Sequence, residues 1–233
     1  MTVSLVKNGR AAKRPRLSSI LLKQVMAVTG VIFVAFVFIH MFGNLKVYQG
    51  AEAFNNYANW LREVGYPLLP KKSVLWALRI VLSLSLVAHV TSGLIIYFRG
   101  RKARGKKKLK LSRMGKNAWM MVPTGLVIGV FIVVHLLDLT IGRAVAPESF
   151  VSGNAYQNLV ASFSRPAMAT FYVFAMLLIA LHIAHGARTM MQDFGVTAHR
   201  TRKIWALLGS LMAIIILLCN AAIPVFVQAG VIS

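Results

Sequence analysis

The sequence predicts an all-α membrane protein built as a bundle of five transmembrane helices. Hydrophobic residues make up 58% of its 233 residues and the mean hydropathy is +0.68, values typical of a polytopic membrane protein. Five apolar segments approach the length of about 20 residues that crosses the hydrocarbon layer. Four of these segments carry a single histidine or a pair of histidines in otherwise apolar sequence.

The five expected spans form one membrane domain, residues 24–227. They cover approximately residues 24–42, 74–98, 119–141, 166–187 and 204–227. The first span lacks a small-residue cleavage site before Phe42, so we interpret it as a retained helix rather than a signal peptide. A basic N-terminal segment, 1–23, precedes the domain and a short tail, 228–233, follows it.

The distribution of positive charge predicts the orientation. Of the 27 lysines and arginines, 20 lie in 1–23, in 99–116 and just after the fourth span. Because such residues collect in cytoplasmic loops, we expect the N-terminus to be cytoplasmic and the C-terminus outside, in the plasma membrane of a bacterium. The net charge of +22 lies in short segments between apolar spans, which argues against nucleic acid and suits anionic lipid or an acidic partner protein.

The first outer loop, residues 46–73, is rich in aromatic residues. It contains AEAFNNYANWLREVGYPLL, in which Tyr57, Trp60 and Tyr66 suit the membrane interface. The pattern predicts a short helix lying on the outer surface. Covering the edge of a cofactor is a second possibility for the same segment.

Histidines inside spans are costly and usually functional. With a rise of 1.5 Å per residue, His40 and His135 lie roughly 26–28 Å from the inner charged boundary, and His89 and His182 roughly 15 and 9 Å from it. These depths predict an outer pair and an inner pair, stacked about 15 Å apart. Two pairs of imidazoles are what two haem irons need for their axial positions, and we therefore expect two haems.

Other histidines and two glycines leave alternatives open. His185 either replaces His182 as a ligand or bonds a propionate, water or a neighbouring helix, and His199 is expected in a basic loop, either solvated or at a partner interface. Gly93 and Gly186 each follow an inner-pair histidine by four residues, on the same helical face. Glycine there lets a macrocycle approach the backbone, although small residues also serve ordinary contacts between membrane helices.

Asp138 is the one acidic residue inside an expected span, three residues after His135. It is a candidate proton group for a quinone or, with equal weight, half of an ion pair with Arg79 or Arg143.

Further polar candidates lie near the ends of the spans. Tyr48 and Asn44 are outer-side candidates for the quinone site. Candidates for the haem propionates are Arg79, Arg99, Arg188 and Lys203.

These residues resemble the di-haem cytochrome b anchor subunit of succinate dehydrogenases and fumarate reductases. The first span reads KQVMAVTGVIFVAFVFIHMFGNLKVY, with TG in mid-helix and H-x-x-G-N at its outer end. The loop segment AFNNYANWL and the motifs RIVLSLSLVAHV, VVHLLDL and ALHIAHGARTMMQDFG continue the likeness from Lys23 to about Val227.

The resemblance implies a five-helix anchor in which His40 and His135 hold the outer haem, and His89 and His182 the inner one. It also implies a flavoprotein subunit and an iron–sulfur subunit docked on the inner face, with menaquinone as the electron partner. The chain would be an electron-transfer subunit of succinate:quinone oxidoreductase, without the catalytic head. Some fumarate reductase relatives carry a carboxylate two residues before the fourth-helix histidine, where this chain has Ala180, so a proton route of that kind is not expected.

The chain cannot supply the other redox centres itself. Cys219 is its single cysteine, and no dinucleotide fingerprint is present, so flavin and iron–sulfur clusters must come from partners. A second hypothesis keeps the redox role but changes the enzyme: the chain would be a di-haem anchor of formate dehydrogenase, hydrogenase or nitrate reductase. A transporter is a further alternative, although the sequence lacks the inverted repeats and broken helices that transporters use.

Overall fold

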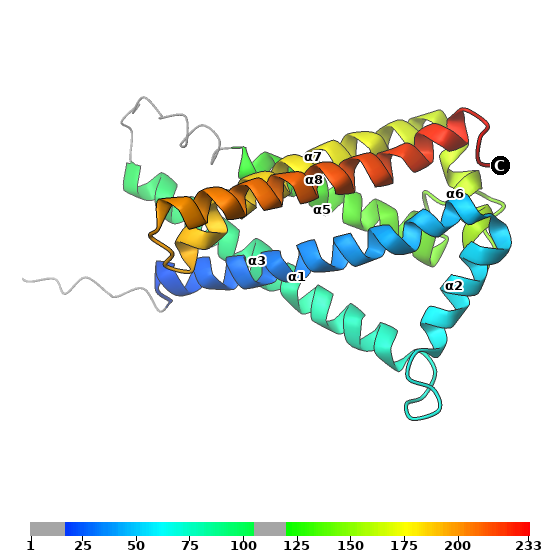
Figure 1. Ribbon diagram of the computed structural model, residues 1–233, viewed down its shortest axis with the longest axis horizontal. Coiled ribbons are helices and arrows are strands. Elements are labelled where there is room, and N and C mark those ends of the chain that lie inside the picture. Colours follow the sequence, from blue (N-terminus) through cyan, green and yellow to red (C-terminus); the bar gives the residue numbers. More distant parts are fainter. Residues whose placement is uncertain (1–16, 105–119) are drawn as a thin grey trace, which may run out of the picture.

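The structure, a computed structural model, describes residues 17–104 and 120–233, and every regular element in these ranges is helical. Figure 1 shows long helices running side by side, with α3 inclined to the others. The elements, in chain order, are α1 (Ser19–Asn44), η1 (Leu45–Gln49), α2 (Ala51–Glu63), α3 (Ser73–Arg104), α5 (Met121–His135), η2 (Leu136–Ile141), α6 (Ala155–Phe163), α7 (Pro166–Asp193) and α8 (His199–Gln228).

Among residues 17–104 and 120–233, five helices are long and apolar enough to cross a membrane, the number that the sequence predicted, and each overlaps one of the expected spans. They are α1 with η1, α3, α5 with η2, α7 and α8. The helices extend beyond the apolar windows, because charged side chains can continue a helix into the headgroup region. His199 is therefore the first residue of α8, and the expectation that it lies in a loop was wrong.

The ends of the helices alternate between the two ends of the bundle. Figure 1 shows the start of α1, the end of α3 and the turn between α7 and α8 at one end, with α2, α6 and the C-terminus at the other. The basic residues predicted for the cytoplasmic side that lie in 1–16 and 105–119 are outside the described residues. Trp119, the expected start of the third span, also lies there.

Local signals explain several helix boundaries. The Ser18 side chain accepts the N–H of Leu21 at 3.1 Å and caps α1. Pro166 opens α7 at a position where its missing N–H costs nothing. Gly142 ends η2 with φ +70°, and a Cβ there would overlap the Phe150 ring, so only glycine fits.

Two short helices lie outside the spans. The predicted helix in the first outer loop is present as α2. The second, α6, was not expected from the sequence; its nine residues lie just before α7. It matters for the site because Ser162 near its end reaches Asp138.

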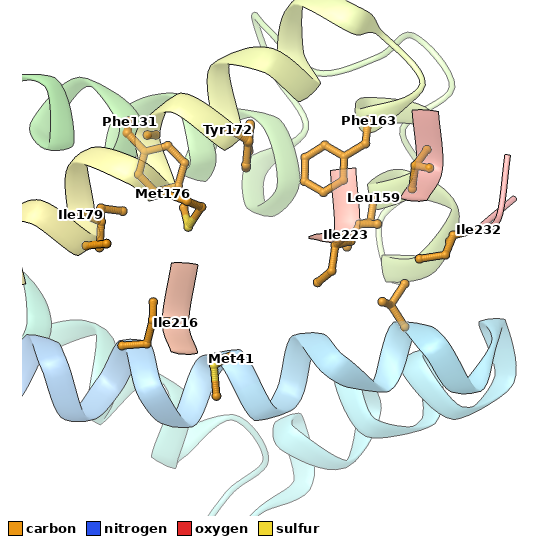
Figure 2. Packing of buried hydrophobic residues seen from close by; sticks show 14 of the residues in the cluster. Met41, Phe131, Leu159, Phe163, Tyr172, Met176, Ile179, Ile216, Ile223 and Ile232 are labelled. Atoms are coloured by element: carbon orange, nitrogen blue, oxygen red, sulfur yellow. The ribbon is translucent and has the colours of Figure 1, made fainter. Parts of the chain in front are cut away.

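The buried core lies where α7 meets α1, α5 and α8. Figure 2 shows Met41 of α1, Phe131 of α5, Ile179 of α7 and Ile216 of α8 among the side chains of this cluster. The outward faces are equally apolar: Leu84, Leu126 and Leu218 are 67%, 71% and 64% exposed. Apolar residues on both faces are typical of a bundle that has lipid as its outer solvent.

The contact between α7 and α8 generates a stability prediction. A Cβ on Gly209 would overlap Cβ of Ala187, so Gly209→Ala should push the two helices apart and cost about 1–3 kcal/mol. A fall in the melting temperature of the detergent-solubilised protein measures this. Gly100→Ala is the matched control, because a Cβ there meets no described atom within 4 Å and should leave the melting temperature unchanged or higher. Equal melting temperatures for the two variants would contradict the packing argument.

Candidate cofactor site: two histidine pairs

The four span histidines lie together as two pairs. The ring centres of His40 on α1 and His135 on α5 are 6.0 Å apart, with the ring planes at 81°. The ring centres of His89 on α3 and His182 on α7 are 6.4 Å apart, at 54°. These are the pairs that helical depth predicted. Their role as ligands stays a prediction.

The spacing within each pair fits an iron held between two imidazoles. A bond from a metal to an imidazole nitrogen is about 2 Å and the ring centre lies about 1 Å further, so two ligands on opposite sides of a metal have centres about 6 Å apart. Each pair offers two nitrogen ligands. Among residues 17–104 and 120–233, no group of three or more His, Cys, Asp or Glu side chains is placed to hold a metal. Two axial ligands are what a porphyrin-bound iron requires.

The two pairs form separate layers. Thr29 on α1 contacts His89 of the inner pair. On the same helix, His40 of the outer pair lies eleven residues after Thr29, which is about 16 Å of helical rise. On α5, an equal interval of eleven residues separates Thr124, which contacts His182, from His135. The two helices therefore give the same distance between the layers.

Neighbouring side chains hold each ring in place. In the inner pair, Nδ1 of His89 lies 2.9 Å from the Thr29 hydroxyl, and Nδ1 of His182 lies 3.2 Å from that of Thr124. These threonines were not identified as site residues from the sequence, although the TG of the first span was noticed as a family feature.

The outer pair is held by aromatic side chains. Phe36 stacks on His40 with ring centres 5.4 Å apart, and Phe131 stacks on His135 at 5.6 Å. The Tyr172 hydroxyl lies 3.5 Å from Nδ1 of His135.

The two glycines expected near the macrocycles differ in their surroundings. A Cβ on Gly93 would lie 3.7 Å from the Met26 sulfur, which is ordinary contact between helices. A Cβ on Gly186 would meet no described atom within 4 Å, so a tight helix contact does not explain that glycine. On α7, the ring beside His89 is that of His182 rather than His185.

Asp138 forms a buried ion pair with a residue that the sequence did not suggest. Its side chain is 0% exposed, and Oδ1 lies 2.9 Å from Nη2 of Arg165. The expected partners, Arg79 and Arg143, were wrong, and Arg79 instead lies over the Trp76 ring, 5.0 Å from its centre.

Two hydroxyls complete the surroundings of the Asp138 carboxylate. Ser162 donates a short hydrogen bond to Oδ2, and the Tyr172 hydroxyl donates to the same oxygen at 3.0 Å. Asp138 lies in the π-helical segment η2, directly after His135 at the end of α5. A π-helical turn changes the direction of the side chains that follow it, and such turns are frequent at functional sites. The chain thus directs His135 towards α1 and Asp138 towards α6 and α7.

The remaining outer-side candidates make structural contacts. The Asn44 side chain donates to that of Asn220 at 2.9 Å and joins the end of α1 to α8. Tyr48 is 43% exposed, and its ring meets Phe226 edge-on with centres 5.8 Å apart.

The propionate candidates on the inner side differ in the contacts that they make with the rest of the chain. Arg99 donates to the backbone oxygen of Leu17 at 2.9 Å, so it ties the end of α3 to the start of α1. Arg188 and Lys203 are exposed at the same end of the bundle. Binding of propionates by any of these residues stays a prediction.

The Asp138–Arg165 pair generates a second stability prediction. Arg165→Leu leaves a buried carboxylate without its cation and should cost about 2–3 kcal/mol, below the value for fully enclosed pairs because the Arg165 side chain is 37% exposed. Asp138→Asn keeps hydrogen bonds to Ser162 and Tyr172 and should cost less. The double variant should regain part of the loss. Thermal unfolding of the four proteins gives the coupling energy, and additive losses would show that the pair contributes no coupling.

Comparison with known proteins identifies related membrane subunits. The family model described as succinate dehydrogenase/fumarate reductase transmembrane subunit matches residues 101–219. The succinate dehydrogenase cytochrome b558 subunit of Bacillus subtilis (strain 168) is 25% identical over 180 residues, covering 75% of this chain and 80% of that protein. No solved structure matches the chain significantly. The chain is a multi-pass membrane protein and belongs to the family of succinate dehydrogenase/fumarate reductase transmembrane subunits.

Proposed function

We propose that the chain is the cytochrome b membrane-anchor subunit of a succinate dehydrogenase and that it passes electrons through two b haems to a membrane quinone. Family membership and the similarity to a cytochrome b558 subunit support the anchor role. The observation that carries the haem proposal is the pair of imidazole spacings, 6.0 and 6.4 Å, each suited to one iron.

Each proposed haem has its own helix pair. His40 of α1 and His135 of α5 would hold the outer haem, and His89 of α3 and His182 of α7 the inner one. A haem supplies one-electron redox chemistry at its iron, and its potential responds to the axial ligands and their hydrogen bonds. The chain's own residues orient the imidazoles.

The remaining redox steps belong to partners. A flavoprotein subunit would oxidise succinate, and an iron–sulfur subunit would pass the electrons to the inner haem. We propose that both dock at the end of the bundle where α1 begins, because the exposed Arg188, Arg200 and Lys203 add positive charge there. Electrons would then cross to the outer haem and reach quinone, for which menaquinone is our proposal.

A quinone needs protons as well as electrons. Asp138 has no exposed side-chain surface, so in this proposal it acts on a quinone only through the Tyr172 hydroxyl or through the partly exposed Arg165. The carboxylate would thus adjust the charge near the outer haem without touching the substrate.

Removal of single ligands tests the haem assignment. His89→Ala or His182→Ala should remove one component of the reduced optical spectrum of the purified complex and leave the other, because the outer pair keeps both imidazoles. His40→Ala or His135→Ala should remove the other component. His185→Ala is the control and should retain both haems, as judged by redox-titrated spectra and the haem content of a pyridine haemochrome assay. Survival of both components in any of the four ligand variants would refute the pairing.

Substrate dependence separates the proposal from its rivals. In the purified complete complex, succinate should reduce both haems, whereas reduction by formate or hydrogen, or oxidation by nitrate, would assign the anchor to another enzyme. A complex without protohaem would remove all of these redox assignments.

The proposed orientation is tested separately. A cysteine placed at Ser233 in a Cys219→Ser background should react with a membrane-impermeant maleimide in intact cells, and one placed at Ser18 should react only after the membrane is broken. The reverse pattern would place the N-terminus outside and contradict the charge argument.

A further inference from the structure

Helices α1 and α5 carry the same pattern of residues. Each has Thr-Gly, then nine residues, then the histidine of the outer pair: Thr29-Gly30 to His40 and Thr124-Gly125 to His135. Each also places a phenylalanine four residues before that histidine, and both phenylalanines stack on it. The two helices therefore present the same groups, at the same spacing, to both layers.

In both helices the threonine meets the inner-pair histidine of a neighbouring helix. The Thr29 hydroxyl of α1 is 2.9 Å from Nδ1 of His89 on α3. The Thr124 hydroxyl of α5 is 3.2 Å from Nδ1 of His182 on α7. The following glycine lies against the same ring, since a Cβ on Gly30 would be 3.7 Å from Cε1 of His89. The repeated Thr-Gly thus holds one edge of each inner imidazole.

The hydrogen of each threonine hydroxyl is already engaged. The Thr29 hydroxyl donates to the Val25 carbonyl at 2.7 Å, and the Thr124 hydroxyl donates to the Met120 carbonyl at the same distance. A hydroxyl has one hydrogen to donate and two lone pairs to accept with. Towards the histidines these oxygens are therefore acceptors, and Nδ1 of His89 and of His182 must carry the proton.

A neutral imidazole with its proton on Nδ1 has a free lone pair on Nε2. Nε2 is the other ring nitrogen, separated from Nδ1 by the carbon Cε1. Hydrogen bonds of this kind fix the tautomer and the orientation of metal-binding histidines and raise the basicity of the ligating nitrogen. Both inner histidines have this hydrogen bond, His89 with Thr29 of α1 and His182 with Thr124 of α5.

We propose that Thr29 and Thr124 are the positioning residues of the inner pair: each accepts the Nδ1 proton of its histidine, directs Nε2 towards the inner haem iron and lowers the potential of that haem. The proposal rests on the proposed function for the presence of the haem. The outer pair has no threonine contact: His135 meets the Tyr172 hydroxyl at the longer distance of 3.5 Å, and His40 stacks on Phe36. Loss of either threonine hydroxyl should therefore act on the inner layer.

The test removes the hydroxyl without changing the size of the side chain. In Thr29→Val or Thr124→Val, the histidine loses its acceptor, so Nε2 becomes a weaker donor and the oxidised iron is stabilised less. We expect the inner haem to titrate at a higher potential and to bind on the order of tenfold more weakly. The outer haem should keep its potential. Redox-titrated optical spectra and the electron paramagnetic resonance g-values of each low-spin haem in the purified complex report these changes.

Two further variants separate the hydrogen bond from packing. Thr29→Ser and Thr124→Ser keep the hydroxyl and lose only a methyl group, so both should restore the inner potential and g-values of the original protein. Thr91→Val makes the same change as the test variants on an exposed side chain of α3, two residues from His89, and should alter neither haem.

The outcomes that overturn the proposal are distinct from failure of the haem assignment. An unchanged inner potential and haem content in both valine variants would overturn it, as would serine variants that behave like the valine variants. A change of equal size at the outer haem would also overturn it. If a valine variant does not assemble, a serine variant with normal inner-haem properties still supports the hydroxyl, and a serine variant with altered properties contradicts it. Absence of haem from the unmodified complex would refute the proposed function itself.

Discussion

An imidazole within the hydrocarbon layer is tolerated when its ring nitrogens have partners, because an unsatisfied polar group there costs several kcal/mol. The bundle meets this need with hydroxyl groups at three of the four span histidines. Hydroxyls of Thr29 and Thr124 take one edge of each inner ring, and Tyr172 lies beside His135 of the outer pair. The ring centres of each pair are 6.0 and 6.4 Å apart, a spacing that suits a metal between them.

Much of the fold was predictable because a membrane span has a strong local signature. The five apolar segments, the surface helix α2 and the depths of the histidines all follow from composition and from the constant rise of a helix. The exact ends did not follow, since polar residues such as His199 continue a helix outside the apolar window. The short helix α6 was missed because its nine residues are far fewer than the about 20 apolar residues that mark a membrane span.

The sequence predicted which histidines meet, but not which side chains support them. Depth along a helix is one-dimensional and identifies which histidines can meet, whereas a hydrogen-bond partner depends on how neighbouring helices face one another. The Thr29 contact with His89 spans 60 residues of sequence, and no local rule indicates it. The Asp138 partner was misassigned because η2 turns the carboxylate away from α3, which carries Arg79, and towards Arg165 at the start of α7.

The eleven-residue interval repeated in α1 and α5 has a mechanical consequence. Each of these helices grips a ring in both layers, so a slide of either one along its axis by a single turn, about 5 Å, would release a hydroxyl at one level and displace an imidazole at the other. Because each helix contacts both layers, the distance between the layers is held constant. The distance between the two proposed haems would thus be set by the rise of these two helices rather than by the loops at their ends.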